Sequence, residues 1–218
     1  MESFLIIGMG RFGSSLAMEL AELGHEVLVI DRDEELVSEI ADTVTHSVIG
    51  DAGDEEVLRS VGAENFDVAV VAIAGNIEES VLITMMLKEM GVKKVVAKAH
   101  NSLHMKILNK IGADIVVFPE RDMGERLARS LSSKDVVDYI ELSGEYSIVE
   151  LKSHEEWAGK TLAELDFREA FGLNVIAVTN EVTNKTTVSP DAEYKITSDD
   201  ELIVVGKDSD IKKLQSKK

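Results

Sequence analysis

The residues best placed to do chemistry lie in a glycine-rich turn near the start of the chain. This turn, Gly8-Met9-Gly10-Arg11-Phe12-Gly13, directly follows an apolar run over residues 4–7. The first glycine permits the tight turn, the second lets backbone N–H groups approach a pyrophosphate, and the third lets the next helix pack closely on the strand. The N-terminus of that helix would face the phosphates. The spacing predicts a phosphate-binding turn, against the alternative of a tight turn without a ligand.

An acidic residue follows where the ribose of a bound nucleotide would lie. A second apolar run, residues 25–30, leads into Asp31, 18 residues after Gly13. A carboxylate at this position can accept hydrogen bonds from both ribose hydroxyls. We assign the neighbouring Arg32 to the same site. The order of a strand, a glycine-rich turn, a helix, a second strand and an acid predicts a nucleotide site. Asp31 alone does not show whether the nucleotide is ATP or NAD.

Two further polar residues are candidates for reading the ends of the nucleotide. Arg11 begins the phosphate-facing helix, and its guanidinium could reach a terminal phosphate and distinguish a triphosphate from a diphosphate. The alternative is a solvated surface arginine. Asp51, with Ala52 after it, follows the third apolar run and could bind the adenine amino group. Its alternative is a helix-capping acid.

Other candidates follow the later apolar runs and so lie at the same carboxyl edge of a parallel sheet. Ala74, Gly75 and Asn76 could form a wall of the nucleotide pocket, although Asn76 is also suited to capping a helix. Lys98 could add positive charge near the phosphates. Glu120 could hold a hard divalent cation such as Mg²⁺ or Ca²⁺ with phosphate oxygens. Its alternative is an acid that favours the helix dipole beside Pro119.

Signals for an enzyme are weak. His100 and His104 are four residues apart and could share a helical face as metal ligands, but no third ligand of suitable spacing follows. The nucleophile-elbow, Walker A and HExxH patterns are missing, and His154 is the sole imidazole of the C-terminal third. A dehydrogenase needs an acid or base and a substrate cavity beside its cofactor. We therefore expect no catalytic residues.

The elements that must position these residues alternate between apolar runs and helical patterns, which is typical of a doubly wound parallel sheet. Six strands are predicted, at residues 4–7, 25–30, 46–50, 67–73, 94–98 and 114–118. Asp33 and Asp54 are expected to cap the second and third helices. The first helix is expected to bury one stripe, formed by Phe12, Leu16, Leu20 and Leu23.

A change of pattern predicts a second, smaller domain. A helix over residues 120–131, with a stripe of Met123, Leu127 and Leu131, leads into a polar linker, and the boundary is placed between residues 134 and 135. After it, an α+β pattern predicts strands near 146–151, 174–179, 186–188 and 201–205 and a helix at 208–214. A capping box at 161–164 and Gly172 bound two short helices.

Composition limits the class of partner. The 218 residues include no cysteine, so disulfides and cysteine-ligated metals are excluded. The formal net charge of −18 argues against nucleic acid or an anionic lipid surface as a partner. The longest strongly apolar run, residues 68–74, is far shorter than a membrane span, and we expect no direct membrane insertion.

With this order of motifs, the sequence resembles the RCK (regulator of potassium conductance) family, with its TrkA-N and TrkA-C domains, and within it the cytosolic subunits of Ktr potassium-uptake systems. The resemblance covers nearly the whole chain: residues 7–13, Asp31, 119–124, 146–151 and the small C-terminal domain. It implies a Rossmann-like domain with a crossover helix, homodimers assembled into an octameric ring, and a cytoplasmic protein bound to a membrane potassium-translocating subunit. The nucleotide, ATP or ADP and in some branches NAD(H), would set the shape of the ring.

The resemblance also implies roles for individual residues. Arg11 would bind the terminal phosphates, Asp31 the ribose, Asp51 the adenine and Glu120 an intersubunit cation. Several members of the family bind cyclic di-AMP between two C-terminal domains, and the matching residues here are Leu162, Ala163, Asp166, Arg168, Phe171, Asn174, Val175 and Pro190. The alternative for these residues is an ordinary domain core with a surface arginine. Ala163 is smaller than the isoleucine that family members often carry.

Three functions remain in competition at this point. The resemblance favours a regulatory subunit that gates potassium uptake. An NAD(H)-dependent oxidoreductase or redox sensor would share the nucleotide turn but would show turnover. The soluble RCK ring of a ligand-gated potassium channel would share the whole fold.

Overall fold

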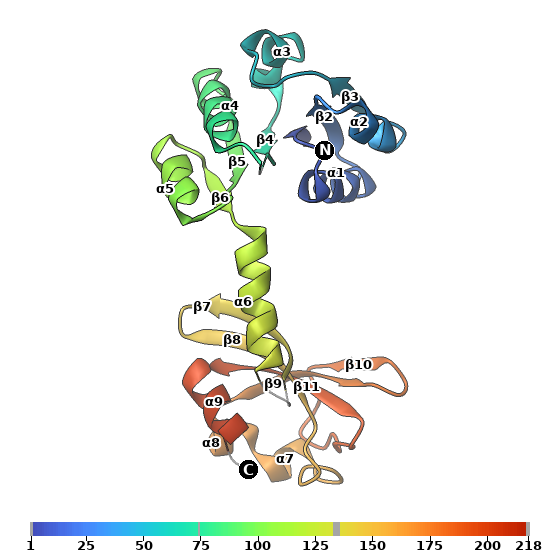
Figure 1. Cartoon of the computed structure of the whole chain (residues 1–218). Helices are drawn as coiled ribbons and strands as arrows, with labels where there is room; N and C mark the ends of the chain where they lie inside the picture. Colours follow the sequence, from blue (N-terminus) through green and yellow to red (C-terminus); the bar gives the residue numbers. More distant parts are fainter. Residues whose placement is uncertain (1, 74, 133–135, 217–218) are drawn as a thin grey trace. The chain divides into compact units, whose positions relative to one another are not determined.

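The computed structural model describes residues 2–73, 75–132 and 136–216. Their Cα positions form two compact units, Met1–Pro119 and Glu120–Lys218 (Figure 1). The boundary expected between residues 134 and 135 falls outside the described part of the chain. No helix in the described ranges is long and apolar enough to cross a membrane.

The first unit is built on a six-stranded parallel sheet, as the sequence predicts. Its strands are β1 (Ser3–Ile7), β2 (Glu26–Asp31), β3 (His46–Ile49), β4 (Val68–Val71), β5 (Lys94–Lys98) and β6 (Ile115–Val117). Their order is β3-β2-β1-β4-β5-β6, and every neighbouring pair is parallel. The order reverses between β1 and β4, and in open α/β sheets the crevice at such a reversal is where ligands bind.

Helices cover both faces of this sheet, which explains why its strands read as continuous apolar runs. Side chains alternate along β1: Leu5 and Ile7 join one core, while Phe4 and Ile6 join the other. The first core is completed by α3 (Glu55–Ser60), α4 (Ile77–Glu89) and α5 (Ser102–Lys110). The second is completed by α1 (Arg11–Glu22) and α2 (Glu34–Ile40).

Local sequence signals set most helix ends correctly. Asp33 and Asp54 cap α2 and α3 through their side chains, as expected. The stripe expected on α1 is confirmed in part: Leu16 and Leu20 pack against the core, while the buried residues are Gly13 and Ala17. Leu23 is 65% exposed. At Gly13 the helix approaches the preceding turn too closely for any side chain.

The second unit contains a five-stranded antiparallel sheet. Its strands are β7 (Val136–Ser143), β8 (Tyr146–Lys152), β9 (Asn174–Asn180), β10 (Lys185–Val188) and β11 (Asp200–Lys207), in the order β10-β9-β11-β8-β7. Strand β7 was not predicted from the sequence. The helices are α6 (Pro119–Leu131), α7 (Leu162–Leu165), α8 (Phe167–Phe171) and α9 (Asp208–Ser216). The predicted capping box is present at Thr161 and Glu164.

Candidate nucleotide-binding site

The phosphate turn connects β1 to α1 with the backbone conformation that its glycines allow. Gly8 has φ +98°, in the left-handed region that favours glycine, and its N–H donates to the Ile30 carbonyl at 2.9 Å. A Cβ placed on Gly13 would lie 1.9 Å from the Gly8 carbonyl oxygen, so α1 packs against the turn itself. In contrast, a Cβ on Gly10 would meet no atom within 4 Å. The first and third glycines are required by the fold, and the second faces open space.

The N-terminus of α1 differs from those of the four following helices. Asp33, Asp54, Asn76 and Asn101 cap α2, α3, α4 and α5 with side-chain hydrogen bonds. No side chain caps α1 at Gly10, and its first turn carries no acid. Its N–H groups and the positive end of the helix dipole are therefore available to an external anion. This arrangement fits a phosphate group.

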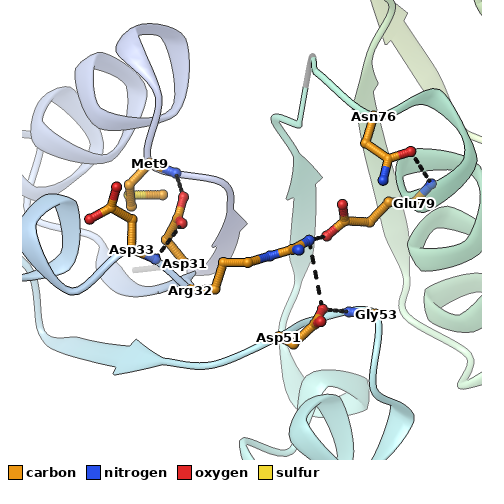
Figure 2. Close-up of polar contacts among 8 residues, drawn as sticks. All are labelled: Met9, Asp31, Arg32, Asp33, Asp51, Gly53, Asn76 and Glu79. Atoms are coloured by element: carbon orange, nitrogen blue, oxygen red, sulfur yellow. Dashed lines mark hydrogen bonds and ion pairs between the residues drawn. The ribbon is translucent and has the colours of Figure 1, made fainter.

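Asp31 is held against the turn by two backbone donors. Its Oδ2 accepts the Met9 N–H at 2.6 Å, and its Oδ1 accepts the Asp33 N–H at 2.9 Å (Figure 2). The carboxylate is half-buried at the end of β2, beside the turn. Because each carboxylate oxygen has a second lone-pair direction, Asp31 can still accept ribose hydroxyls. Asp31 is thus fixed directly against the phosphate turn and keeps acceptor capacity for a ligand.

Arg32 lies between two carboxylates at the same edge of the sheet. Its guanidinium pairs with Glu79 and lies 3.9 Å from Asp51 Oδ1 (Figure 2). Asp51 does not cap α3, since Asp54 does; instead its Oδ1 accepts the Gly53 N–H at 2.8 Å. The capping alternative for Asp51 is therefore wrong.

The other residues predicted at this edge lie in different surroundings. Asn76 caps α4 through the Glu79 N–H at 3.2 Å, as its alternative role requires. Gly75 is exposed and Ala52 is 5% exposed, while Ala74 lies outside the described residues. The buried Lys98 places its Nζ 5.5 Å from the centre of the Phe12 ring, on the first turn of α1.

Met9 and Arg11 point to opposite environments. Met9 is 1% exposed and packs in the core beneath α1 and α2, so only its backbone can contact a ligand. The Arg11 side chain is exposed. Glu120 is also exposed, in the first turn of α6, and belongs to the second unit.

The two histidines do not share a helical face, contrary to the sequence-based alternative. His100 precedes the cap of α5, and its N–H donates to His104 Nδ1 at 3.2 Å. His104 is 1% exposed, and burial holds its pKa below the ordinary value. The described residues contain no group of three or more histidine, cysteine or acidic side chains able to hold a metal.

A pocket of about 320 Å³ occurs in the second unit, where the family resemblance implies a second ligand. Seven of the eight residues named for that ligand line it, namely Leu162, Ala163, Asp166, Arg168, Asn174, Val175 and Pro190. Phe171 does not; its ring packs in the core, 5.4 Å from Phe167 and 6.3 Å from Trp157 between centres. Phe167, Leu173, Asp191 and Ala192, which sequence reasoning missed, complete the lining.

Comparison with known families and proteins agrees with this geometry. The TrkA-N domain family matches residues 4–119, and the TrkA-C domain family matches residues 146–218. The chain is 45% identical over 216 residues to Ktr system potassium uptake protein C of Bacillus subtilis (strain 168), covering 99% of this chain and 97% of that protein. It is 41% identical over 215 residues to Ktr system potassium uptake protein A of the same organism, covering 99% and 96%.

Solved structures share the fold at lower identity. The crystal structure of the GsuK RCK domain has a TM-score of 0.69 at 22% identity, covering 98% of this chain and 47% of that chain. The GsuK channel bound to NAD has a TM-score of 0.68 at 21% identity, covering 96% and 38%. The chain spans less than half the length of each of these two GsuK chains.

Proposed function

The chain belongs to the family of potassium uptake proteins with TrkA-N and TrkA-C domains, and we propose that it is a nucleotide-sensing regulatory subunit of such a system. In this proposal it is a cytoplasmic protein without catalytic activity that binds a membrane potassium-translocating subunit. An adenine nucleotide in the first unit controls that partner. The observation that carries the proposal is the uncapped N-terminus of α1 beside the anchored Asp31.

The proposed ligand is ATP or ADP. The pyrophosphate approaches Gly10, where a Cβ would meet open space, and the ribose hydroxyls donate to Asp31. Arg11, exposed at the start of α1, reaches the γ-phosphate and so distinguishes the two nucleotides. Glu120 would hold Mg²⁺ or Ca²⁺. NAD(H) is the competing ligand, because GsuK binds NAD in one of its structures and Asp31 suits either dinucleotide or mononucleotide.

The proposed assembly is a homodimer that forms an octameric ring. Helix α6 supports an interaction with a second chain, because its apolar stripe is open to solvent. Met123, Leu127 and Leu131 are 58%, 54% and 76% exposed. Three large apolar side chains on one helical face are typical of a surface that another chain covers.

A second ligand, cyclic di-AMP, is proposed for the pocket of the second unit. Arg168 provides a cation for a phosphate, and Asn174 provides amide groups for a purine edge, within an otherwise largely apolar lining. The gathering of seven predicted residues around one pocket supports this proposal over an ordinary domain core.

Thermal unfolding of the full chain with ATP, ADP, NAD, NADH or cyclic di-AMP tests these assignments. A ligand at a hundredfold excess over its Kd stabilises the folded state by about 2.7 kcal/mol, which is a shift of several degrees. We expect ATP and ADP to raise the Tm of the native chain and to lose that effect in Asp31→Asn. Asp42→Asn, which makes the same chemical change at an exposed residue of the turn after α2, is the matched control.

The outcomes separate the competing functions. Loss of the ATP and ADP shifts in Asp42→Asn, or their survival in Asp31→Asn, would contradict the site. A shift with NADH alone, accompanied by a change in nicotinamide absorbance with candidate substrates, would favour the oxidoreductase. Arg11→Ala is expected to weaken ATP binding more than ADP binding, and equal losses would exclude Arg11 as the γ-phosphate sensor.

A further inference from the structure

The end of β2 carries two residues with opposite preferences for the ribose of a nucleotide. An acid at this position favours a free 2′-hydroxyl, whereas a nearby arginine accommodates a 2′-phosphate. The chain has both, Asp31 and Arg32 in succession. Which class of nucleotide the site accepts therefore depends on whether the Arg32 guanidinium is available to an incoming phosphate.

The structure shows that carboxylates of the chain itself engage this guanidinium. Arg32 extends from the end of β2 to Glu79 on α4, and Asp51 lies beside the same nitrogen at 3.9 Å (Figure 2). Arg32 and Glu79 are 47 residues apart in sequence. An arginine and a carboxylate in contact form a charge-assisted pair that competes directly with a phosphate for the same donors.

Glu79 is the better-held of the two carboxylates. Its side chain is 13% exposed, against 55% for Asp51. Its backbone N–H is fixed by the Asn76 cap, and its position in the first turn of α4 places the negative charge at the favourable end of the helix dipole. The Arg32 side chain itself is 57% exposed, so the pair is held from the Glu79 side. Glu79 is therefore positioned to keep Arg32 from turning toward the ribose.

We infer that Glu79, by holding Arg32, makes the site select adenine nucleotides with a free ribose 2′-hydroxyl and reject those with a 2′-phosphate. The inference rests on the proposed nucleotide site. A 2′-phosphate would have to displace Glu79 from Arg32 and would also approach Asp31, Asp33 and Asp51. Arg32 is one cation among four carboxylates, so a doubly charged phosphate meets repulsion that a hydroxyl does not.

The test compares ADP with 2′-phospho-ADP, which differ only in the 2′-phosphate. Calorimetry on the full chain at pH 7.5 gives the Kd of each ligand and the ratio of the two. We expect the native chain to bind ADP at least about tenfold more tightly than 2′-phospho-ADP. Glu79→Gln keeps the shape of the side chain but removes its charge, and should reduce that preference by about tenfold, the effect of one hydrogen bond to a charged group.

Two further variants show whether Arg32 is responsible. Glu78→Gln makes the same change in charge at the exposed neighbouring residue of α4, and should leave the ratio as in the native chain. The double variant Arg32→Gln with Glu79→Gln removes the released guanidinium, so the tighter binding of 2′-phospho-ADP should disappear.

Each contrary outcome has a distinct meaning. Three results would overturn the inference: equal affinity of the native chain for the two ligands, an unchanged ratio in Glu79→Gln, or tighter binding of 2′-phospho-ADP that persists in the double variant without Arg32. In each case, binding of ADP would still support the proposed function. Failure of the native chain to bind ADP would overturn both.

Discussion

The glycines of the phosphate turn allow folding and nucleotide binding to be separated by one chemical change made at two positions. Gly10 and Gly13 are three residues apart, and each can be replaced by alanine. We predict that Gly13→Ala destabilises the chain without ligand, whereas Gly10→Ala leaves that stability nearly unchanged but weakens the binding of ADP. The contrast follows from what a new methyl group would meet at each position.

At Gly13 the methyl group has no room. It would lie 1.9 Å from the Gly8 carbonyl oxygen and 3.2 Å from the Ala72 Cβ, so either α1 or the turn must move. Overpacking of this kind costs about 1–3 kcal/mol. At roughly 4 °C for each kcal/mol in a unit of this size, the Tm of Gly13→Ala should fall by about 4–12 °C.

At Gly10 the methyl group enters open space. The residue has φ −67° and ψ 177°, which alanine adopts freely. Alanine is a poorer helix cap than glycine by about 0.5–1 kcal/mol, but it also reduces the entropy of the unfolded chain by a similar amount. The two effects nearly cancel, so the stability without ligand should change by less than about 1 kcal/mol. The methyl group would nevertheless stand where we propose that the pyrophosphate binds.

Differential scanning fluorimetry without ligand and calorimetric titration with ADP give the two readouts. Gly10→Ala should lose one or two hydrogen bonds to a charged phosphate. Its affinity for ADP should therefore be about ten- to a hundredfold weaker than that of the native chain. Native-like affinity in Gly10→Ala would refute the assignment of the phosphate to this turn. A Tm of Gly13→Ala equal to that of the native chain would show that α1 is not packed as the structure describes.

Three further predictions address other parts of the chain. Arg168→Ala should abolish the rise in Tm with cyclic di-AMP and retain the rise with ADP. Asp67→Asn should lower the stability at pH 7, as measured by urea titration. Hydrogen bonds from Lys93, and secondly from Ser3, lower the pKa of Asp67 from 3.8 to about 2, so the charged carboxylate stabilises the folded state above this range. The difference between variant and native chain should therefore close as the pH falls from 3.8 to about 2. Burial lowers the pKa of His104 in the folded chain below its ordinary value of 6.5. As the pH falls below 6.5, His104 is therefore protonated in the unfolded chain but not in the folded chain, and the native chain should lose stability. His104→Gln should reduce that loss.

Most of the fold could be predicted because its signals are local. Runs of β-branched residues and capping acids occupy neighbouring positions, and the six parallel strands follow from them. Strand β7 was missed although it contains the β-branched residues Val136, Val137 and Ile140. It is an edge strand, most of its side chains are exposed or half-buried, and its pairing with β8 shifts register twice. A bulge breaks the alternation that identifies a half-buried strand.

In the candidate site, too, the features set by neighbouring residues could be predicted and the contacts between distant residues could not. The turn and Asp31 were accessible because glycine spacing and strand ends restrict the backbone directly. The pair of Arg32 and Glu79 was not, because it depends on how β2 and α4 are placed by the sheet. Phe171 was named for the second ligand by resemblance alone, and resemblance does not show on which side of a five-residue helix the ring lies; here it packs 5.4 Å from Phe167 between ring centres.

The proposed gating function places a requirement on the assembly. The turn is fixed by the chain's own hydrogen bonds, from Gly8 N–H to the Ile30 carbonyl and from Met9 N–H to Asp31, so it offers the same contacts to ATP and ADP. A ligand shifts a conformational equilibrium only by its difference in affinity for the two states. Moving that equilibrium from 1:99 to 99:1 takes about 5.5 kcal/mol, whereas one hydrogen bond from Arg11 to a γ-phosphate supplies about 1.5–3 kcal/mol. One site is therefore insufficient, and about two to four sites must act on a shared conformation, which is the energetic argument for a ring of identical subunits.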